Sequence, residues 1–184
     1  FTKKANDPRF ISWHTDSFVY GFEPAETVTA WLGFNDSTIE SGCLRYIPGS
    51  HKQESIHEIR PDPNNLAGLG QNVIDVPEEN AVYAELKAGE VVFHHESVVH
   101  SSGPNRANHP RIGFSIHYVA PHVKETRFDG ATAMLLRGED KYGYWGADPL
   151  PRYDLDPVCI NSMTETREKF MSITARKIEA GGRS

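Results

Sequence analysis

Two potential metal ligands lie two residues apart near the start of the chain, in the run Trp13-His14-Thr15-Asp16. Residues i and i+2 of a β-strand point to the same face, so a strand here would bring the imidazole of His14 and the carboxylate of Asp16 together. A third candidate, His100, lies far downstream, before a Ser-Gly turn. Two histidines and one carboxylate bind iron(II) while three coordination positions stay open. A 2-oxo acid can fill two of these positions and dioxygen the third, so the trio predicts oxygenase chemistry.

Arg111 follows His100 by eleven residues and lies on a predicted strand. A guanidinium group pairs with a carboxylate through two parallel hydrogen bonds. Arg111 is therefore predicted to bind the far carboxylate of a dicarboxylic co-substrate. Each feature is weak alone, because an H-x-D tripeptide is common by chance; the prediction depends on their conjunction.

The elements that must position these residues are predicted to be mostly short strands. β-Branched and aromatic residues, interrupted by Gly, Pro and Asn-Asp-Ser turns, predict strands over residues 27–34, 43–47, 73–76, 81–86, 91–94 and 111–119. Strands of this length and spacing are typical of a sandwich or jelly roll. Residues 87–90 are expected to form a tight hairpin between the two strands that flank them.

Two segments differ from this pattern. Residues 55–71 are polar and contain Pro61 and Pro63, which predicts a long loop or lid. Residues 164–180 predict the clearest helix, and an apolar stripe of Phe170, Ile173 and Ile178 is expected to pack it against the domain.

Composition limits the class of protein. The 184 residues suit one domain, and we expect a single domain over residues 1–184. A net charge of -6 with interspersed signs argues against a nucleic-acid partner, and no apolar run approaches the length of a membrane span. The two cysteines, Cys43 and Cys159, cannot form a disulfide framework, so we expect a cytoplasmic location and two small buried side chains.

Several segments also resemble the phytanoyl-CoA dioxygenase family of iron and 2-oxoglutarate oxygenases. The matching segments cover most of residues 12 to 121 and are Trp13-His14-Thr15-Asp16, Val28-Thr29-Ala30-Trp31-Leu32, Ser41-Gly42-Cys43-Leu44-Arg45-Tyr46-Ile47-Pro48-Gly49-Ser50-His51, and His100-Ser101-Ser102-Gly103-Pro104-Asn105-Arg106 followed by Arg111. The stretch from Gly42 to His51 is the most specific of them.

The resemblance implies a double-stranded β-helix, that is, a jelly roll, with iron on His14, Asp16 and His100. It further implies that Arg111 binds the distal carboxylate of 2-oxoglutarate, helped by the Ser102 hydroxyl and the Trp31 side chain. In this family the H-x-D motif follows a helical region, whereas here it begins at residue 14. We therefore expect the chain to lack the N-terminal helical part.

The expected activity is that of an iron(II)- and 2-oxoglutarate-dependent dioxygenase that hydroxylates a small molecule, consumes O2 and releases succinate and CO2. Related halogenases carry a small residue where this chain has Asp16, so hydroxylation is favoured over halogenation. The alternatives are a non-catalytic cupin-like domain that binds a metal or ligand, and a zinc or manganese cupin isomerase or hydrolase, which Arg111 argues against. A zinc protease is disfavoured because His95 and His100 are five residues apart, whereas a helical pair needs four.

Most of the remaining candidates have two interpretations. His94 and His95 are predicted to line the barrel wall, with a supporting role at the ligands as the sharper alternative. His117 is either packed in the structure or part of a pocket, and Phe18, Tyr20 and Phe22 line a substrate site or the core. Arg45 is expected in a structural ion pair, and His51 and His57 in solvent.

Overall fold

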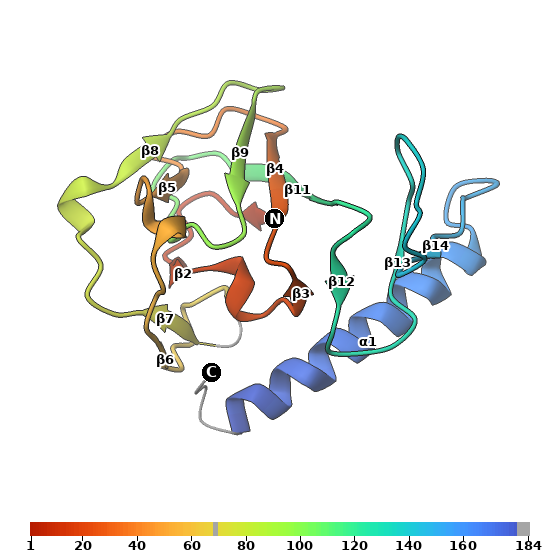
Figure 1. Ribbon diagram of the computed structural model, residues 1–184. Coiled ribbons are helices and arrows are strands. Elements are labelled where there is room, and N and C mark those ends of the chain that lie inside the picture. Colours follow the sequence, from red (N-terminus) through yellow and green to blue (C-terminus); the bar gives the residue numbers. More distant parts are fainter. Residues whose placement is uncertain (68–69, 180–184) are drawn as a thin grey trace.

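The computed structural model describes residues 1–67 and 70–179, and its main body is a jelly roll of two four-stranded antiparallel sheets (Figure 1). One sheet has the strand order β1-β11-β4-β9 and the other β2-β10-β5-β8. The bounds are β1 Thr2–Lys3, β2 Ile11–His14, β4 Thr27–Gly33, β5 Leu44–Tyr46, β8 Val82–Ala84, β9 Val91–His95, β10 His100–Ser102 and β11 Arg111–Val119. The predicted fold class is confirmed.

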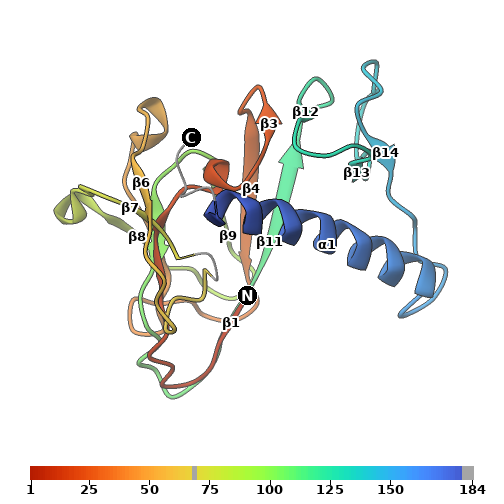
Figure 2. The same cartoon turned by 90° about the horizontal axis from the view of Figure 1, so that it is seen from below.

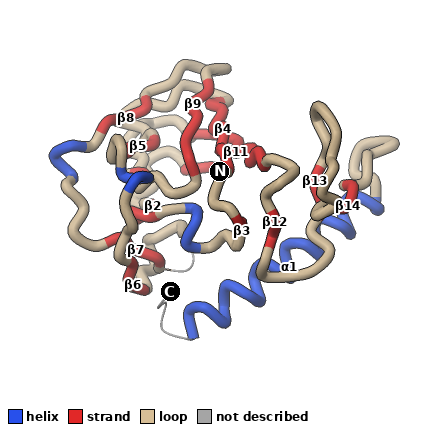
Figure 3. Tube along the Cα trace, viewed as in Figure 1, coloured by secondary structure: helices blue, strands red, loops and turns tan. Residues whose placement is uncertain are grey.

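Smaller elements surround these sheets and leave much of the chain in loops (Figure 3). They are the paired strands β3 Phe22–Glu23 with β12 Lys124–Glu125, β6 His57–Ile59 with β7 Gln71–Val73, and β13 Thr132–Ala133 with β14 Gly146–Ala147, the 3-10 turns η1 Asp16–Phe18, η2 Ser50–Lys52 and η3 Glu78–Asn80, and the helix α1 Pro157–Glu179. The segment predicted as a loop over residues 55–71 thus contains β6, which pairs with β7.

The expected hairpin over residues 87–90 is wrong. The backbone does turn there, since the Glu90 amide donates to the Lys87 carbonyl at 3.0 Å. However, β8 pairs with β5 and β9 pairs with β4, so the turn carries the chain from one sheet to the other. The strand predicted over residues 73–76 is also displaced, because β7 ends at Val73.

Helix α1 begins at Pro157, earlier than the predicted start at Thr164. The Asp156 carboxylate accepts the Val158 amide at 3.1 Å, and proline is favoured in the first helical turn because its missing N–H is not needed there. Figures 1 and 2 show α1 beside the jelly roll rather than within it. The predicted helix end at Ala180 and the side chain of Ile178 lie outside the described residues. Within the described part of the chain, no helix is long and apolar enough to cross a membrane.

The inward face of the first sheet carries polar side chains beside Trp31. On β4, Thr27 and Thr29 are buried whereas Val28 between them is 42% exposed. On β11, Arg111 is buried whereas Phe114 is 51% exposed. Alternate residues of a strand point to opposite faces, so the interior of the jelly roll receives the polar set. Buried polar side chains need partners, which suggests that this interior is a site rather than a core.

An apolar core lies on the other side of β2. Trp13, Ile47, Val73 and Val99 pack together there, and the Arg45 guanidinium lies 4.4 Å from the centre of the Trp13 ring. Arg45 also pairs with Glu78 at 3.1 Å, which confirms the predicted ion pair. Because Trp13 points into this core, its neighbour His14 points to the opposite face of β2.

Candidate metal centre

The structure brings His14, Asp16 and His100 together. His14 ends β2 and His100 begins β10, and the two residues are direct partners in the antiparallel pairing of these strands. One ligand atom from each of the three side chains lies within 4.8 Å of the others. The expectation that Asp16 shares a strand with His14 is wrong, because the strand ends at His14 and Asp16 is the first residue of η1. The turn, not strand alternation, brings the carboxylate back toward the imidazoles.

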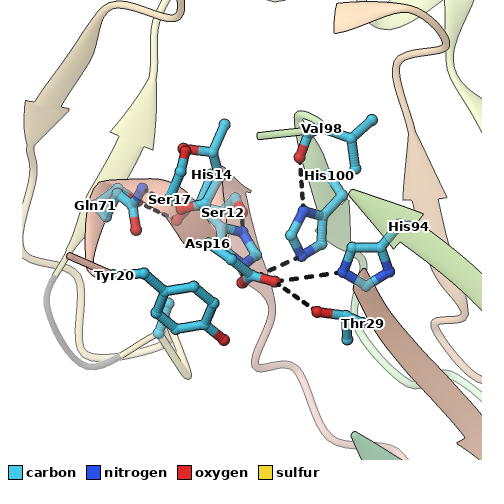
Figure 4. A network of polar contacts seen from close by, with 12 residues as sticks. Ser12, His14, Asp16, Ser17, Tyr20, Thr29, Gln71, His94, Val98 and His100 are labelled. Carbon is cyan, nitrogen blue, oxygen red and sulfur yellow. Dashed lines mark hydrogen bonds and ion pairs between the residues drawn. The ribbon is translucent and has the colours of Figure 1, made fainter. Parts of the chain in front are cut away.

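Backbone carbonyls orient both imidazoles (Figure 4). His14 Nδ1 lies 2.8 Å from the Ser12 carbonyl oxygen, and His100 Nδ1 lies 3.0 Å from that of Val98. A carbonyl can only accept, so each Nδ1 carries the proton and each neutral ring keeps a lone pair on Nε2. Both Nε2 atoms lie 3.9 Å from Asp16 Oδ1. This is the donor set and the supporting hydrogen bonding of a transition-metal site.

The charges favour cation binding. Burial lowers the pKa of His100 to about 3, so its imidazole is neutral and able to coordinate at physiological pH. Burial alone would raise the pKa of Asp16, but the hydrogen bond from His94 and the nearby histidines outweigh it and hold the pKa below its usual range. The site therefore offers one negative charge from Asp16 and an uncharged nitrogen donor from His100.

The second oxygen of Asp16 is bound by the protein. His94 Nε2 and Thr29 Oγ1 each lie 3.4 Å from Asp16 Oδ2 (Figure 4). The Tyr46 hydroxyl lies 3.1 Å from His94 Nδ1. Because Nε2 donates to the carboxylate, Nδ1 accepts from Tyr46. His94 thus supports a ligand, the sharper of its two predicted roles. Tyr46 and Thr29 were not among the predicted site residues, although their inward positions follow once their strands are paired.

His117 lies on the face of β11 that carries Arg111, and its side chain is exposed but bonded to groups beside Asp16, in agreement with one of its two interpretations. Its Nδ1 lies 2.9 Å from Thr29 Oγ1 and 3.1 Å from the Tyr20 hydroxyl. His117, Thr29 and Tyr20 thus line the space beside Asp16 with hydrogen-bonding groups.

Arg111, Ser102 and Trp31 also meet. Arg111 Nη2 donates to Ser102 Oγ at 3.0 Å, and the guanidinium lies 5.1 Å from the centre of the Trp31 ring. Burial lowers the pKa of Arg111 to about 10. The Ser102 hydroxyl donates to the Gly42 carbonyl at 2.8 Å, so its proton is already used. Among the residues that the structure describes, no carboxylate forms an ion pair with Arg111, and its Nε has no hydrogen-bond partner.

The remaining sequence interpretations concern the zinc-protease alternative, His57, Phe18 and the two cysteines. His94 and His95 lie on strand β9, not on a helix, in agreement with the rejection of a zinc protease. His57 was expected in solvent, but its ring stacks on Phe18 at 4.5 Å and its Nε2 lies 3.1 Å from Thr15 Oγ1. Phe18 itself is buried, in agreement with core packing. Cys43 is buried as expected, and Cys159 only partly so.

The sequence and structure match those of known non-haem oxygenases. The model of the phytanoyl-CoA dioxygenase (PhyH) family matches residues 1–113. Because this match covers more than half of the sequence, the chain belongs to the phytanoyl-CoA dioxygenase family.

Individual proteins named for this family are similar to the chain in sequence. A phytanoyl-CoA dioxygenase domain-containing protein 1 homolog from Dictyostelium discoideum is 35% identical over 115 residues, which are 59% of this chain and 40% of that protein. A probable phytanoyl-CoA dioxygenase from Caenorhabditis elegans is 28% identical over 169 residues, 90% of this chain and 53% of that protein. The chain thus spans about half or less of the length of these relatives.

Solved structures share the fold. The apo form of the non-heme monooxygenase ThoJ superposes with a TM-score of 0.82 and 27% identity, over 98% of this chain and 66% of that one. EvdO2 from Micromonospora carbonacea var. aurantiaca, complexed with 2-oxoglutarate, has a TM-score of 0.59 and 25% identity, over 68% and 51% of the two chains. The carbocyclase SnoK from nogalamycin biosynthesis has a TM-score of 0.53 and 26% identity, over 67% and 48%. Proteins similar to this chain therefore differ in the reaction that their names state.

Proposed function

We propose that this chain is the core of an iron(II)- and 2-oxoglutarate-dependent dioxygenase, with His14, Asp16 and His100 as the iron ligands. The observation that carries the proposal is the convergence of two Nε2 lone pairs and one carboxylate oxygen from three separate elements. The donor set fits iron(II), because imidazole and carboxylate together suit this metal and no fourth protein ligand completes the group among the described residues. EvdO2, the neighbour bound to 2-oxoglutarate, supports the choice of co-substrate.

When bound, iron(II) would supply the redox chemistry that couples O2 and the decarboxylation of 2-oxoglutarate to oxidation of an unreactive C–H bond, giving succinate and CO2. The protein's own side chains have simpler tasks. His94 and Thr29 bind Asp16 Oδ2, which leaves Oδ1 directed at the two histidines. Arg111, buried and without a carboxylate partner among the described residues, would bind the distal carboxylate of the co-substrate beside Trp31.

The proposed reaction on the small-molecule substrate is hydroxylation. Asp16 supports this choice over halogenation, since its carboxylate would bind the iron where a halogenase leaves room for a halide. The hydrogen-bonding groups of Tyr20, Thr29 and His117 beside Asp16 favour a substrate with polar groups. The cytoplasmic location stays a prediction.

Two measurements test the proposal. Isothermal titration of the nickel(II)-loaded protein with 2-oxoglutarate should give saturable binding at one site. Mass spectrometry should then detect succinate from 2-oxoglutarate that depends on iron(II), O2 and a substrate, and His100→Ala should abolish it. Metal binding without 2-oxoglutarate binding would contradict the proposal and favour the cupin-like binding domain instead.

A further inference from the structure

Two buried cationic side chains lie side by side against strand β10, which also carries His100. Lys3 and Arg111 are both only 1% exposed. They are direct partners in the antiparallel pairing of β1 with β11, and both reach the same atom: Lys3 Nζ and Arg111 Nη2 lie 2.7 Å and 3.0 Å from Ser102 Oγ. Lys3 Nζ also donates to the carbonyls of Ser102 and Gly103.

This arrangement is unfavourable without an anion. Like charges directly opposite each other on paired strands destabilise the pairing, and buried charges are normally neutralised by a partner. Neither cation has an ion pair among the described residues, and the Asp7 carboxylate is engaged with Arg9 at 2.6 Å. Burial and then repulsion by Arg111 lower the pKa of Lys3 to about 7, as expected for a cation pair that lacks its counterion.

The Ser102 hydroxyl oxygen accepts a hydrogen bond from each of the two cations. Its hydroxyl proton is donated to the Gly42 carbonyl, so both lone pairs are free to accept, one from Lys3 and one from Arg111. The contact between Ser102 and the co-substrate that the family resemblance implies stays a prediction. Ser102 here holds the two cationic groups close to each other.

We infer that Lys3 is a second cationic residue of the co-substrate subsite, a positioning residue that holds Ser102 and Arg111 and makes the site selective for 2-oxo acids with a distal carboxylate. The inference rests on the proposed function. The competing explanation is that Lys3 is a structural tie, since its three donor positions are used by Ser102 and Gly103. The two explanations differ in what they predict for ligands with and without the distal carboxylate.

The test compares 2-oxoglutarate with 2-oxopentanoate, which has the same carbon chain but lacks the distal carboxylate. Dissociation constants would be measured by calorimetry on the nickel(II)-loaded protein, so that no turnover occurs. Lys3→Met removes the charge and keeps most of the side-chain volume. Lys4→Met is the matched control, because Lys4 is the exposed neighbour on the same strand end.

We expect Lys3→Met to weaken 2-oxoglutarate binding at least tenfold and to leave 2-oxopentanoate binding within twofold of wild type, while Lys4→Met changes neither. Equal weakening of both ligands by Lys3→Met, or no weakening of either, would overturn the inference. If Lys3→Met does not fold, Lys3→Gln keeps a hydrogen-bond donor without the charge and is tested in the same way. Failure of the wild-type protein to bind 2-oxoglutarate would refute the proposed function itself. This outcome is distinct from the outcomes that would overturn only the role of Lys3.

Discussion

Gly113 lies where a strand and a tryptophan ring approach too closely for any side chain. A Cβ atom added at Gly113 would lie 2.5 Å from two carbons of the Trp31 indole and closer still to a third. Carbon atoms in contact prefer a separation of about 3.5–4.0 Å, so Gly113→Ala must move the ring by roughly 1 Å or more. The same ring lies beside the Arg111 guanidinium, so we expect the substitution to disturb both packing and the co-substrate subsite.

Overpacking of this kind costs about 1–3 kcal/mol. For a chain of this size, 1 kcal/mol corresponds to a change in Tm of roughly 2–4 °C, so we expect Gly113→Ala to lower Tm by roughly 2–12 °C. Thermal and urea unfolding followed by tryptophan fluorescence would measure the loss of stability, and calorimetry on the nickel(II)-loaded protein the loss of 2-oxoglutarate affinity.

Gly103→Ala is the matched control, because a Cβ there would meet nothing within 4 Å. It should leave Tm and affinity close to wild type. A Gly113→Ala protein that melts within about 1 °C of wild type and binds 2-oxoglutarate equally well would refute the reasoning, because the ring would then have room to move at no cost.

Three further results are expected. Arg111→Met should weaken 2-oxoglutarate binding by about two orders of magnitude, since a charge-assisted pair contributes roughly 2–3 kcal/mol. Calorimetry should show an unchanged affinity for nickel(II). An equal loss of 2-oxoglutarate affinity and nickel(II) affinity would disprove the separation of the two subsites. His94→Phe removes a hydrogen bond to Asp16 and should lower metal affinity about 10–100-fold, as measured by competition with a chelator. His100→Ala should abolish metal binding. An unchanged metal affinity in His94→Phe would show that Asp16 does not need the hydrogen bond from His94. The folded-state pKa of Lys3 is lowered to about 7 from 10.5, so between these values the unfolded chain holds the extra proton and the free energy of unfolding of the ligand-free protein should rise with pH, by at most about 1.4 kcal/mol per unit. Urea unfolding at pH 7 to 10 should show that the free energy of unfolding rises less with pH in Lys3→Met than in the wild type. The same dependence on pH in the two proteins would contradict the lowered pKa of Lys3.

The sequence alone was enough to select the candidate residues of the site. His14, Asp16, His100 and Arg111 could be selected because imidazole, carboxylate and guanidinium groups have specific uses, and because the surrounding motif is that of a known family. Strand β11 was predicted with its observed bounds, since β-branched and aromatic residues favour a pleated backbone wherever it packs. Such preferences are local, so they can be read along the chain.

Only the tertiary structure decided which residues share a space. The pairing of β1 with β11 placed Lys3 beside Arg111, and nothing local distinguishes Lys3 from the exposed Lys4. The division of strands between two sheets likewise made the turn over residues 87–90 a crossing instead of a hairpin. Strand register and sheet membership depend on contacts between residues far apart in the chain, and the composition of a single segment does not encode them.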